Sequence, residues 1–296
     1  MSSRTPAQRR TRRLLSVALV VVLIVGVIAL VWLAVAHVRG STAPATTRPV
    51  PTFTSGPETT APSSPPSAAP IATVTVPGAA ERFLSVGTGA MWRATAGDCG
   101  SVEPLLERST DGGATWSDVT PRYLGIGQIL SVDAFAGTEA QVTALTGSSC
   151  QVQALRTFTQ GRFWEPNADT LAAATYVDPA ATGRLVIRGE SVAAPCETPW
   201  GVRAEGATVA LICDGTASLW IDDAWEPIAT ATQALAVAAD GATTATTSSD
   251  CAGLVVTAAG GLPACAADAA ATGPAALALT DDGALVWSGD TLTLTP

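Results

Sequence analysis

The sequence predicts an all-β domain that is held at a membrane by one N-terminal transmembrane helix. Three observations lead to this prediction. Residues 14–38 contain no charged side chain, residues 41–70 are mostly Pro, Ser, Thr and Ala, and the rest of the chain alternates short β-type runs with turns. The 296-residue chain is 47% hydrophobic and 14% charged, so it has enough apolar material for a sizeable core.

The charge-free run, LLSVALVVVLIVGVIALVWLAVAHV, is long enough to cross a bilayer, because about 20 apolar residues span the hydrocarbon core. Five arginines lie within residues 1–13, so the positive-inside rule predicts a cytoplasmic tail and an outer C-terminal part. A cleaved signal peptide is the alternative, since Ala34 and Ala36 form an A-x-A arrangement. The run exceeds the roughly 7–15 apolar residues of a signal peptide, which favours an uncleaved single-pass anchor.

Residues 39–70 are expected to be a disordered stalk between the anchor and the domain. Their Pro-, Ser- and Thr-rich composition buries too little apolar surface to offset the entropy of the chain. The prolines favour an extended polyproline II conformation, which would lift the following domain away from the bilayer.

The charge balance and the histidine content exclude several function classes. From Gly40 onward the chain has ten arginines and all 25 acidic residues, so this part carries about −15 and repels nucleic acid. The only histidine, His37, falls at the end of the predicted span. The outer domain therefore cannot use a Ser-His-Asp or Cys-His arrangement, nor a zinc site with histidine ligands.

Residues 71–296 have an all-β pattern. Turn signals such as GTG, DGG, DDG and AGG separate short apolar runs, which include RFLSV, QVTAL, RLVIRG, TVALIC, LAVAA, GLVVTA, AALAL and TLTLTP. No apolar pattern at helical spacing persists for more than a turn or two. We therefore expect a single all-β domain over these residues.

The segment STDGGATW predicts a self-capped β-hairpin. Glycine supplies the positive φ that a tight turn needs, and the preceding Asp can accept hydrogen bonds from the backbone of the turn. The flanking EPLLERS and WSDVT are the two expected strands. The segment resembles the Asp box, Ser/Thr-x-Asp-x-Gly-x-Thr-Trp, of bacterial neuraminidase repeats and related β-propellers. It matches at every position, through Ser109, Asp111, Gly113, Thr115 and Trp116.

The resemblance implies a β-propeller in which the box joins the outer two strands of a blade and has a structural role. Three weaker echoes follow, in which these residues keep the spacing of the box: Thr157, Gly161 and Trp164; Ser218 and Trp225; Thr280, Asp282 and Trp287. At about 40 residues per blade, we expect about five or six blades. The C-terminal TLTLTP is expected to share a blade with the first strand and so to close the ring.

All six cysteines lie in the outer domain, which suggests three disulfides in an oxidising compartment. Six cysteines allow 15 pairings. We favour one link between neighbouring blades and two short-range links, with the pairs Cys99–Cys150, Cys196–Cys213 and Cys251–Cys265. A metal cluster is disfavoured, because the domain has neither a CxxC pair nor a histidine.

The expected function is binding, without a cofactor or metal. Sialidases with Asp boxes use an arginine triad, a Tyr–Glu nucleophile pair and an Asp acid, but Tyr123 and Tyr176 lie in no such context. The domain's nine arginines fall in no family motif: Arg82, Arg93, Arg108, Arg122, Arg156, Arg162, Arg184, Arg188 and Arg203. We therefore expect an extracellular binding or scaffolding module for a cell-envelope protein or glycan, with its contacts on the central face.

Two other functions stay open at this point. A divergent sialidase-like glycoside hydrolase would need two carboxylates about 5–9.5 Å apart across an open central pocket. An assembly factor similar to the photosystem II stability proteins, which also carry Asp boxes, would act through a protein partner.

Overall fold

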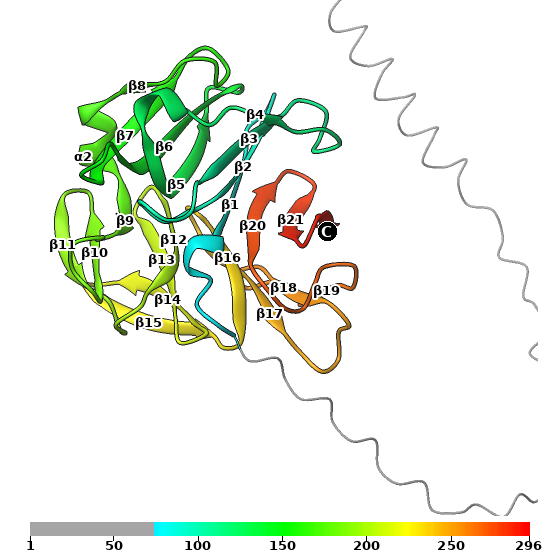
Figure 1. Ribbon diagram of the computed structural model, residues 1–296. Helices are drawn as coiled ribbons and strands as arrows, with labels where there is room; N and C mark the ends of the chain where they lie inside the picture. Colours follow the sequence, from blue (N-terminus) through cyan, green and yellow to red (C-terminus); the bar gives the residue numbers. More distant parts are fainter. Residues whose placement is uncertain (1–73) are drawn as a thin grey trace, which may run out of the picture. The chain divides into compact units, whose positions relative to one another are not determined.

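The computed structural model describes residues 74–296, which form six small antiparallel sheets arranged around a common axis (Figure 1). The chain is therefore an all-β propeller with six blades, at the upper end of the expected range. The predicted tail, membrane span and stalk lie outside the described residues. No helix within residues 74–296 is long and apolar enough to cross a membrane.

Each blade is formed by consecutive strands of the chain. The bounds of blades 1 and 2 are β1 (Arg82–Val86), β2 (Met91–Thr95), β3 (Leu105–Ser109), β4 (Ser117–Asp118), β5 (Ile126–Phe135), β6 (Glu139–Thr146), β7 (Gln151–Thr157) and β8 (Glu165–Pro166). Those of blades 3 and 4 are β9 (Thr175–Val177), β10 (Arg184–Ile187), β11 (Glu190–Ala193), β12 (Trp200–Glu205), β13 (Thr208–Cys213), β14 (Thr216–Ile221) and β15 (Ala224–Ala229). Those of blades 5 and 6 are β16 (Thr232–Ala238), β17 (Gly241–Thr247), β18 (Leu254–Thr257), β19 (Ala264–Ala266), β20 (Ala275–Thr280), β21 (Gly283–Ser288) and β22 (Thr291–Thr295).

The inner strands β16 and β20 are buried over most of their length, because each lies between two neighbouring blades. In β16, TQALAVA, the first five residues are all buried, and small alanines allow the close approach of β12 and β20. The outermost strands β4, β8 and β15 are mostly exposed. Burial is therefore high in the inner strands β16 and β20 and in the second strands β6 and β13, whereas the inner strand β5 has only three buried residues of ten.

The ring closes by side-chain packing and not by a shared sheet. The C-terminal strand β22 pairs with β21 inside blade 6, whereas β1 pairs with β2 inside blade 1. The expectation that TLTLTP shares a blade with the first strand was therefore wrong. Blade 1 already has four strands of its own, so closure depends on the packing of β1 against β20.

A stack of arginine and tryptophan side chains lies at this junction of blades 1 and 6. The Arg93 guanidinium lies between two rings, 4.2 Å from the centroid of Trp116 and 4.9 Å from that of Trp287. Arg82 covers Trp287 at 4.3 Å. Glu107 pairs with Arg93 Nε at 2.7 Å, which offsets the cost of removing this arginine from water.

Blade 3 departs from the regular pattern. It has only three strands, and the short helix α2 (Ala168–Ala173) precedes them. Asn167 caps this helix, since its side chain accepts a hydrogen bond from Thr170 N at 2.8 Å. The chain returns to an extended conformation at Ala174 and enters β9 at Thr175.

Candidate functional site

A mostly buried arginine–glutamate pair lies near the propeller axis. Arg203, on β12 of blade 4, crosses the axis to blade 1, where its Nη2 donates to the Arg82 carbonyl at 2.9 Å and its Nη1 lies 4.0 Å from Glu81 Oε1. Glu81 Oε1 accepts a hydrogen bond from Gly201 N at 2.9 Å. The guanidinium also covers the ring of Phe83 at 4.8 Å. These contacts tie two opposite blades together at the centre of the ring.

Burial governs the protonation of this pair. It raises the pKa of Glu81, while the nearby charge of Arg203 and the hydrogen bond from Gly201 lower it. The pKa of Arg203 is lowered by burial, and the carboxylates of Glu81 and Asp133 oppose that change. Each charge is therefore stabilised mainly by the other, in a setting that is otherwise unfavourable for charge.

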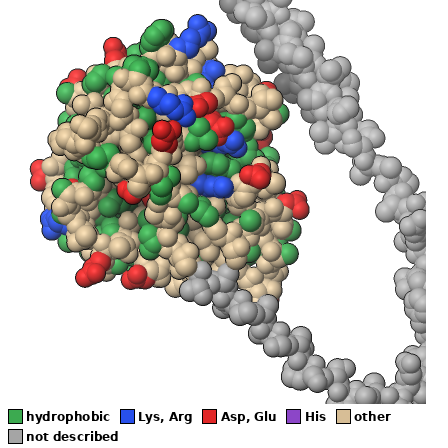
Figure 2. Space-filling model, in the orientation of Figure 1, with side chains coloured by type: hydrophobic (Ala, Val, Ile, Leu, Met, Phe, Trp, Pro, Cys, Tyr) green, Lys and Arg blue, Asp and Glu red, His purple; other side chains and the backbone are tan. Residues whose placement is uncertain are grey.

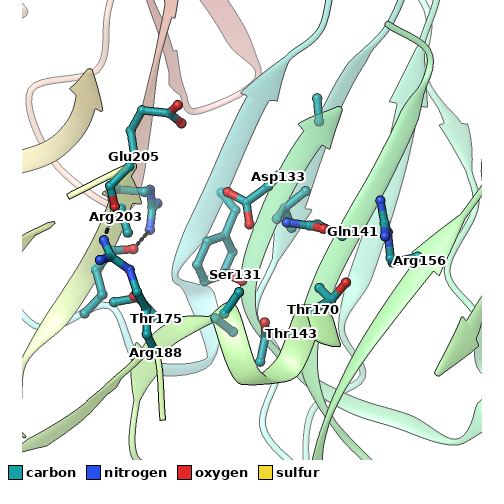
Figure 3. Close-up of a pocket in the computed structure, with 18 of the residues that line it drawn as sticks. Ser131, Asp133, Gln141, Thr143, Arg156, Thr170, Thr175, Arg188, Arg203 and Glu205 are labelled. Atoms are coloured by element: carbon teal, nitrogen blue, oxygen red, sulfur yellow. Dashed lines mark hydrogen bonds between the residues drawn. The ribbon is translucent and has the colours of Figure 1, made fainter. Parts of the chain in front are cut away.

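A polar cavity of about 440 Å³, the upper cavity, lies beside this pair at the end of the ring where the strands β5 and β12 finish. Figure 3 shows Ser131, Asp133, Gln141 and Arg156 on the blade 2 side, with Arg188, Arg203 and Glu205 across from them. Helix α2 contributes further lining through Asp169, Thr170 and Ala173. Three of the nine arginines of the described residues line this cavity.

Among the acidic groups that line this cavity, Asp133 has the pKa that differs most from its ordinary value. Its side chain is exposed to solvent at the cavity, and the protein that surrounds the cavity raises its pKa to about 6 through desolvation. Arg203 opposes this change and Glu205 adds to it. Asp133 therefore changes its charge near neutral pH and could either accept or donate a hydrogen bond to a ligand.

Two arginines form the outer wall. Arg156 lies over the rings of Phe135 and Phe158, at 4.4 and 5.1 Å from their centroids, and its buried Nε has no hydrogen-bond partner within the described residues. Arg188 donates from its Nη2 to the carbonyl of Gly206. The arrangement can bind polar or charged groups of a ligand, because each guanidinium keeps unused donors.

A second cavity, the lower cavity, has about 300 Å³ and opens at the other end of the inner strands. Its lining is more apolar, with Ile129, Leu130, Val177, Pro199 and Trp200, and Glu81 and Gln128 form its polar part. Within residues 74–296 there is no group of three or more His, Cys, Asp or Glu side chains that could hold a metal ion.

The Ser109–Trp116 segment forms the predicted hairpin between β3 and β4, away from both cavities. Ser109 Oγ donates to Asp111 Oδ1 at 2.7 Å and accepts from Gly113 N at 2.9 Å. Asp111 accepts from Thr115 N at 2.9 Å and from Thr115 Oγ1 at 2.6 Å. Trp116 Nε1 donates to the Gly113 carbonyl at 3.0 Å. The segment is thus a self-capped turn with no role in the cavities.

The first weaker echo has the same geometry. It joins β7 to β8, where Thr157 Oγ1 accepts from Gly161 N at 2.9 Å and Trp164 Nε1 donates to the Gly161 carbonyl at 3.1 Å. The Thr159 hydroxyl replaces the Asp carboxylate, accepting from Phe163 N at 2.8 Å and donating to its carbonyl at 3.2 Å. One hydroxyl can do both because it is a donor and an acceptor.

The other two echoes do not form this turn. Thr280, Asp282 and Trp287 belong to the inner hairpin of β20 and β21, so their place in the blade differs. Trp225 does lie in an outer hairpin, but the turn between β14 and β15 consists of Asp222 and Asp223 alone, with φ of 48° and 62°. This is a two-residue turn of the type that suits tight hairpins. The expected repeat was therefore wrong at these two segments.

The turn should respond to acid through Asp111. Hydrogen bonds from Thr115 and Ser109 lower the pKa of Asp111 to about 2, so the stability that they contribute is present above pH 4 and is lost as the pH falls toward 2. We expect Asp111→Ala to lower the melting temperature at pH 7 and to have little effect near pH 2. Asp282→Ala is the matched control, and an equal decrease in both variants would contradict this role.

The three disulfides are Cys99–Cys150, Cys196–Cys213 and Cys251–Cys265, the pairing that the sequence favoured. The first two join neighbouring blades, and the third lies within blade 5. Cys196–Cys213 was expected to be a short-range link, and it also joins two blades. Cys196 follows the last strand of blade 3, and Cys213 ends β13 of blade 4.

The length of the loop that each disulfide closes predicts which of two of them stabilises the folded state more. Cys99–Cys150 closes 51 residues and Cys251–Cys265 closes 14. We expect the Cys99→Ser/Cys150→Ser variant to lose about 1 kcal/mol more of unfolding free energy than Cys251→Ser/Cys265→Ser, from a typical loss of about 2–4 kcal/mol. Urea denaturation of both variants measures this, and the reverse order would contradict the loop-entropy explanation.

The chain has a distant similarity to several solved structures. No protein-family model and no curated protein sequence matches the chain. Among solved structures, YCF48 bound to D1 peptide has 15% identity and a TM-score of 0.38, over 72% of this chain and 78% of that one. AofleA from Arthrobotrys oligospora has 9% identity and a TM-score of 0.43, over 74% and 87%. The Hadza microbial sialidase Hz136 has 12% identity and a TM-score of 0.30, over 69% and 49%.

The cavity residues have no signal in the sequence that separates them from other polar residues. Arg156, Arg188 and Arg203 were three of nine arginines without a motif, and Asp133 was one of many acids. They meet because three different blades place them around one opening. Tyr123 and Tyr176, by contrast, do not line the upper cavity.

Proposed function

We propose that this chain is a membrane-anchored, extracytoplasmic binding module whose upper cavity contacts a protein or glycan of the cell envelope. The observation that carries the proposal is the cavity itself, about 440 Å³, with three arginines and the acids Asp133 and Glu205 on facing walls. The lining also includes Asp169, so three arginines and three acids surround one opening and offer both donors and acceptors to a ligand. Figure 2 shows that Asp and Glu side chains are scattered over the face in view.

The proposed location depends on residues 14–38 as the anchor and residues 39–70 as the stalk. Three disulfides in the described residues support an oxidising compartment. A single cysteine in place of Ser63 in intact cells should react with a membrane-impermeant maleimide, whereas one in place of Ser2 should react only after lysis. The opposite pattern would overturn the proposed orientation.

Site-specific photo-crosslinking tests the binding face. The full chain in its own membrane, with a photoreactive amino acid in place of Gln141, should give defined crosslinks to an envelope component. The control position is Asp290, which is exposed and lies outside the lining of the upper cavity. The crosslinks should weaken at least fivefold when Arg156→Ala and Arg188→Ala are added. Equal crosslinking from both positions, or none from Gln141, would contradict the proposal.

Glycoside hydrolysis is the second candidate, because Asp133, with a pKa of about 6, faces the same cavity as Glu205. Two features favour binding over hydrolysis. Arg203 occupies part of the axis, where the cavity between the inner strands has only about 220 Å³. Neither tyrosine lines the upper cavity, so no Tyr–Glu nucleophile is formed there. Release of an aryl alcohol from aryl glycosides that is abolished by Asp133→Asn would favour the hydrolase instead.

A further inference from the structure

Blade 3 lacks the innermost strand that the other five blades have. β5 runs from the lower cavity, at Gln128, to the upper cavity, at Asp133, and β12 runs the same way from Trp200 to Glu205. β9 runs in the opposite direction, because Thr175 lines the upper cavity and Val177 the lower one. The strands β9, β10 and β11 therefore correspond to the second, third and fourth strands of a regular blade.

Helix α2 explains how the first strand is bypassed. In a regular blade the chain enters at the lower end of the ring and rises along the axis. Here α2 packs against β7 and leads the chain from β8 directly to the upper end of β9. The place that an inner strand would fill, between β5 and β12 on the axial side of β9, receives no strand from residues 74–296.

The hydrogen-bonding groups on the axial edge of β9 have no partners in the described residues. Arg188 N donates to Ala174 O and Asp178 N donates to Arg184 O, both at 2.9 Å. Because these groups alternate along a strand, the backbone groups of Thr175 and Val177 point away from β10 and toward the axis. No hydrogen bond within residues 74–296 reaches them, although Thr175 is only 8% exposed.

The two cavities lie at the two ends of this edge. Val202 lines both, while Thr175 lines the upper one and Val177 the lower one. Their volumes are about 440 and 300 Å³. The upper end is polar and the lower end is mostly apolar.

We propose that an extended segment of a partner polypeptide inserts here as the missing inner strand of blade 3. The segment would run antiparallel to β9, exchange hydrogen bonds with Thr175 and Val177, and place an apolar side chain in the lower cavity and a polar one in the upper cavity. This inference rests on the proposed function and narrows its ligand to a polypeptide, because the free groups belong to a backbone ladder.

The stalk of the same chain is a poor occupant. Within residues 41–70 no more than five residues separate successive prolines, and proline cannot donate to a ladder. Val74, the first described residue, packs near Gly215 of blade 4, and Val76 lines the lower cavity together with Val177. The longest proline-free run of the stalk, residues 52–56, is the own-chain alternative that the experiment must separate.

The test begins with heptapeptides selected from a displayed random library on the purified full chain. We expect selected peptides to bind at least tenfold more weakly to Val177→Pro, because proline removes an axial N–H that β10 does not use. The melting temperature of this variant should stay close to that of the parent. Tyr176→Pro, which removes a ladder N–H, is the matched control and should be clearly destabilised.

Two further measurements keep the proposal falsifiable if Val177→Pro does not fold. N-methylation of every second amide of the selected peptide should abolish binding when the methylated amides face β9. It should leave binding unchanged when they face away from β9. The Thr175 and Val177 amides should exchange with deuterium rapidly in the free chain and slowly when a selected peptide is bound.

Three results would overturn the strand proposal. The first is the absence of any selected peptide, and the second is binding that is indifferent to Val177→Pro and to amide methylation. If peptide binding is indifferent to Val177→Pro but is lost in Arg156→Ala/Arg188→Ala, the upper cavity is still the binding face and only the insertion of a strand is refuted. The third is slow exchange of the Thr175 and Val177 amides in the free chain that becomes fast when residues 52–56 are deleted. That result would show that the stalk itself occupies the place of the inner strand.

Discussion

Replacing Trp287 by alanine is expected to lower the free energy of unfolding by about 3–5 kcal/mol, because it empties the junction that closes the ring. The ring of Trp287 is 5% exposed and packs with Leu84, Ala276 and Ala278. Its loss also removes the aromatic face beside Arg82 and Arg93. Urea denaturation of the full chain in detergent measures the change.

Two variants separate ring closure from the general loss of an aromatic residue. Trp287→Phe should cost about 1–2 kcal/mol, since the Nε1 of Trp287 has no hydrogen-bond partner in the described residues and a ring is kept. Trp220→Ala, in the outer hairpin of blade 4, should cost less than Trp287→Ala because its side chain is only partly buried. Equal losses of unfolding free energy from Trp220→Ala and Trp287→Ala would show that the junction of blades 1 and 6 contributes no more stability than an outer hairpin.

Arg203→Leu is expected to cost about 3–5 kcal/mol, because it leaves the buried carboxylate of Glu81 without its partner. Only 17% of the Arg203 side chain and 19% of that of Glu81 are exposed. The double variant Glu81→Gln/Arg203→Leu should recover a substantial part of this loss, since the isolated charge is then absent. Arg162→Leu, at an exposed arginine, is the control and should change stability little.

The cost of Arg203→Leu should depend on pH. Burial already raises the pKa of Glu81 above the ordinary 4.5, and removing Arg203 raises it further. A carboxyl with a raised pKa in the folded state contributes stability at low pH that is lost as the pH rises through that pKa. The variant should therefore approach the parent in stability near pH 4 and fall behind it toward pH 7. A cost that does not change with pH would contradict a charged Glu81.

Local patterns in the sequence predicted the parts of the fold that short segments determine. The turn from Ser109 to Trp116 could be predicted because its hydrogen bonds join residues no more than four positions apart. The same holds for the inner strands β16 and β20, whose apolar runs follow from their burial. Helix α2 was missed because its six residues are too few to show an amphipathic pattern.

The cavity and the closure could not be predicted, because both depend on contacts between distant segments. Arg203 meets the Arg82 carbonyl across 121 residues, and nothing near either residue in sequence indicates the contact. The echoes at Trp225 and Trp287 kept the spacing of an Asp box but belong to other turns, since a tryptophan after a turn is also common in plain hairpins. Spacing alone did not distinguish the two cases.

The most direct test of the central claim is a hydrogen–deuterium exchange comparison of the full chain in its own membrane with the full chain purified in detergent. If the upper cavity and the adjacent edge of β9 bind an envelope partner, residues 131–134, 174–177 and 202–206 should be more protected in the membrane sample. Residues 109–116, on the outer turn of blade 1, should not differ. Protection confined to that outer turn, or no difference at the three cavity segments, would contradict the claim.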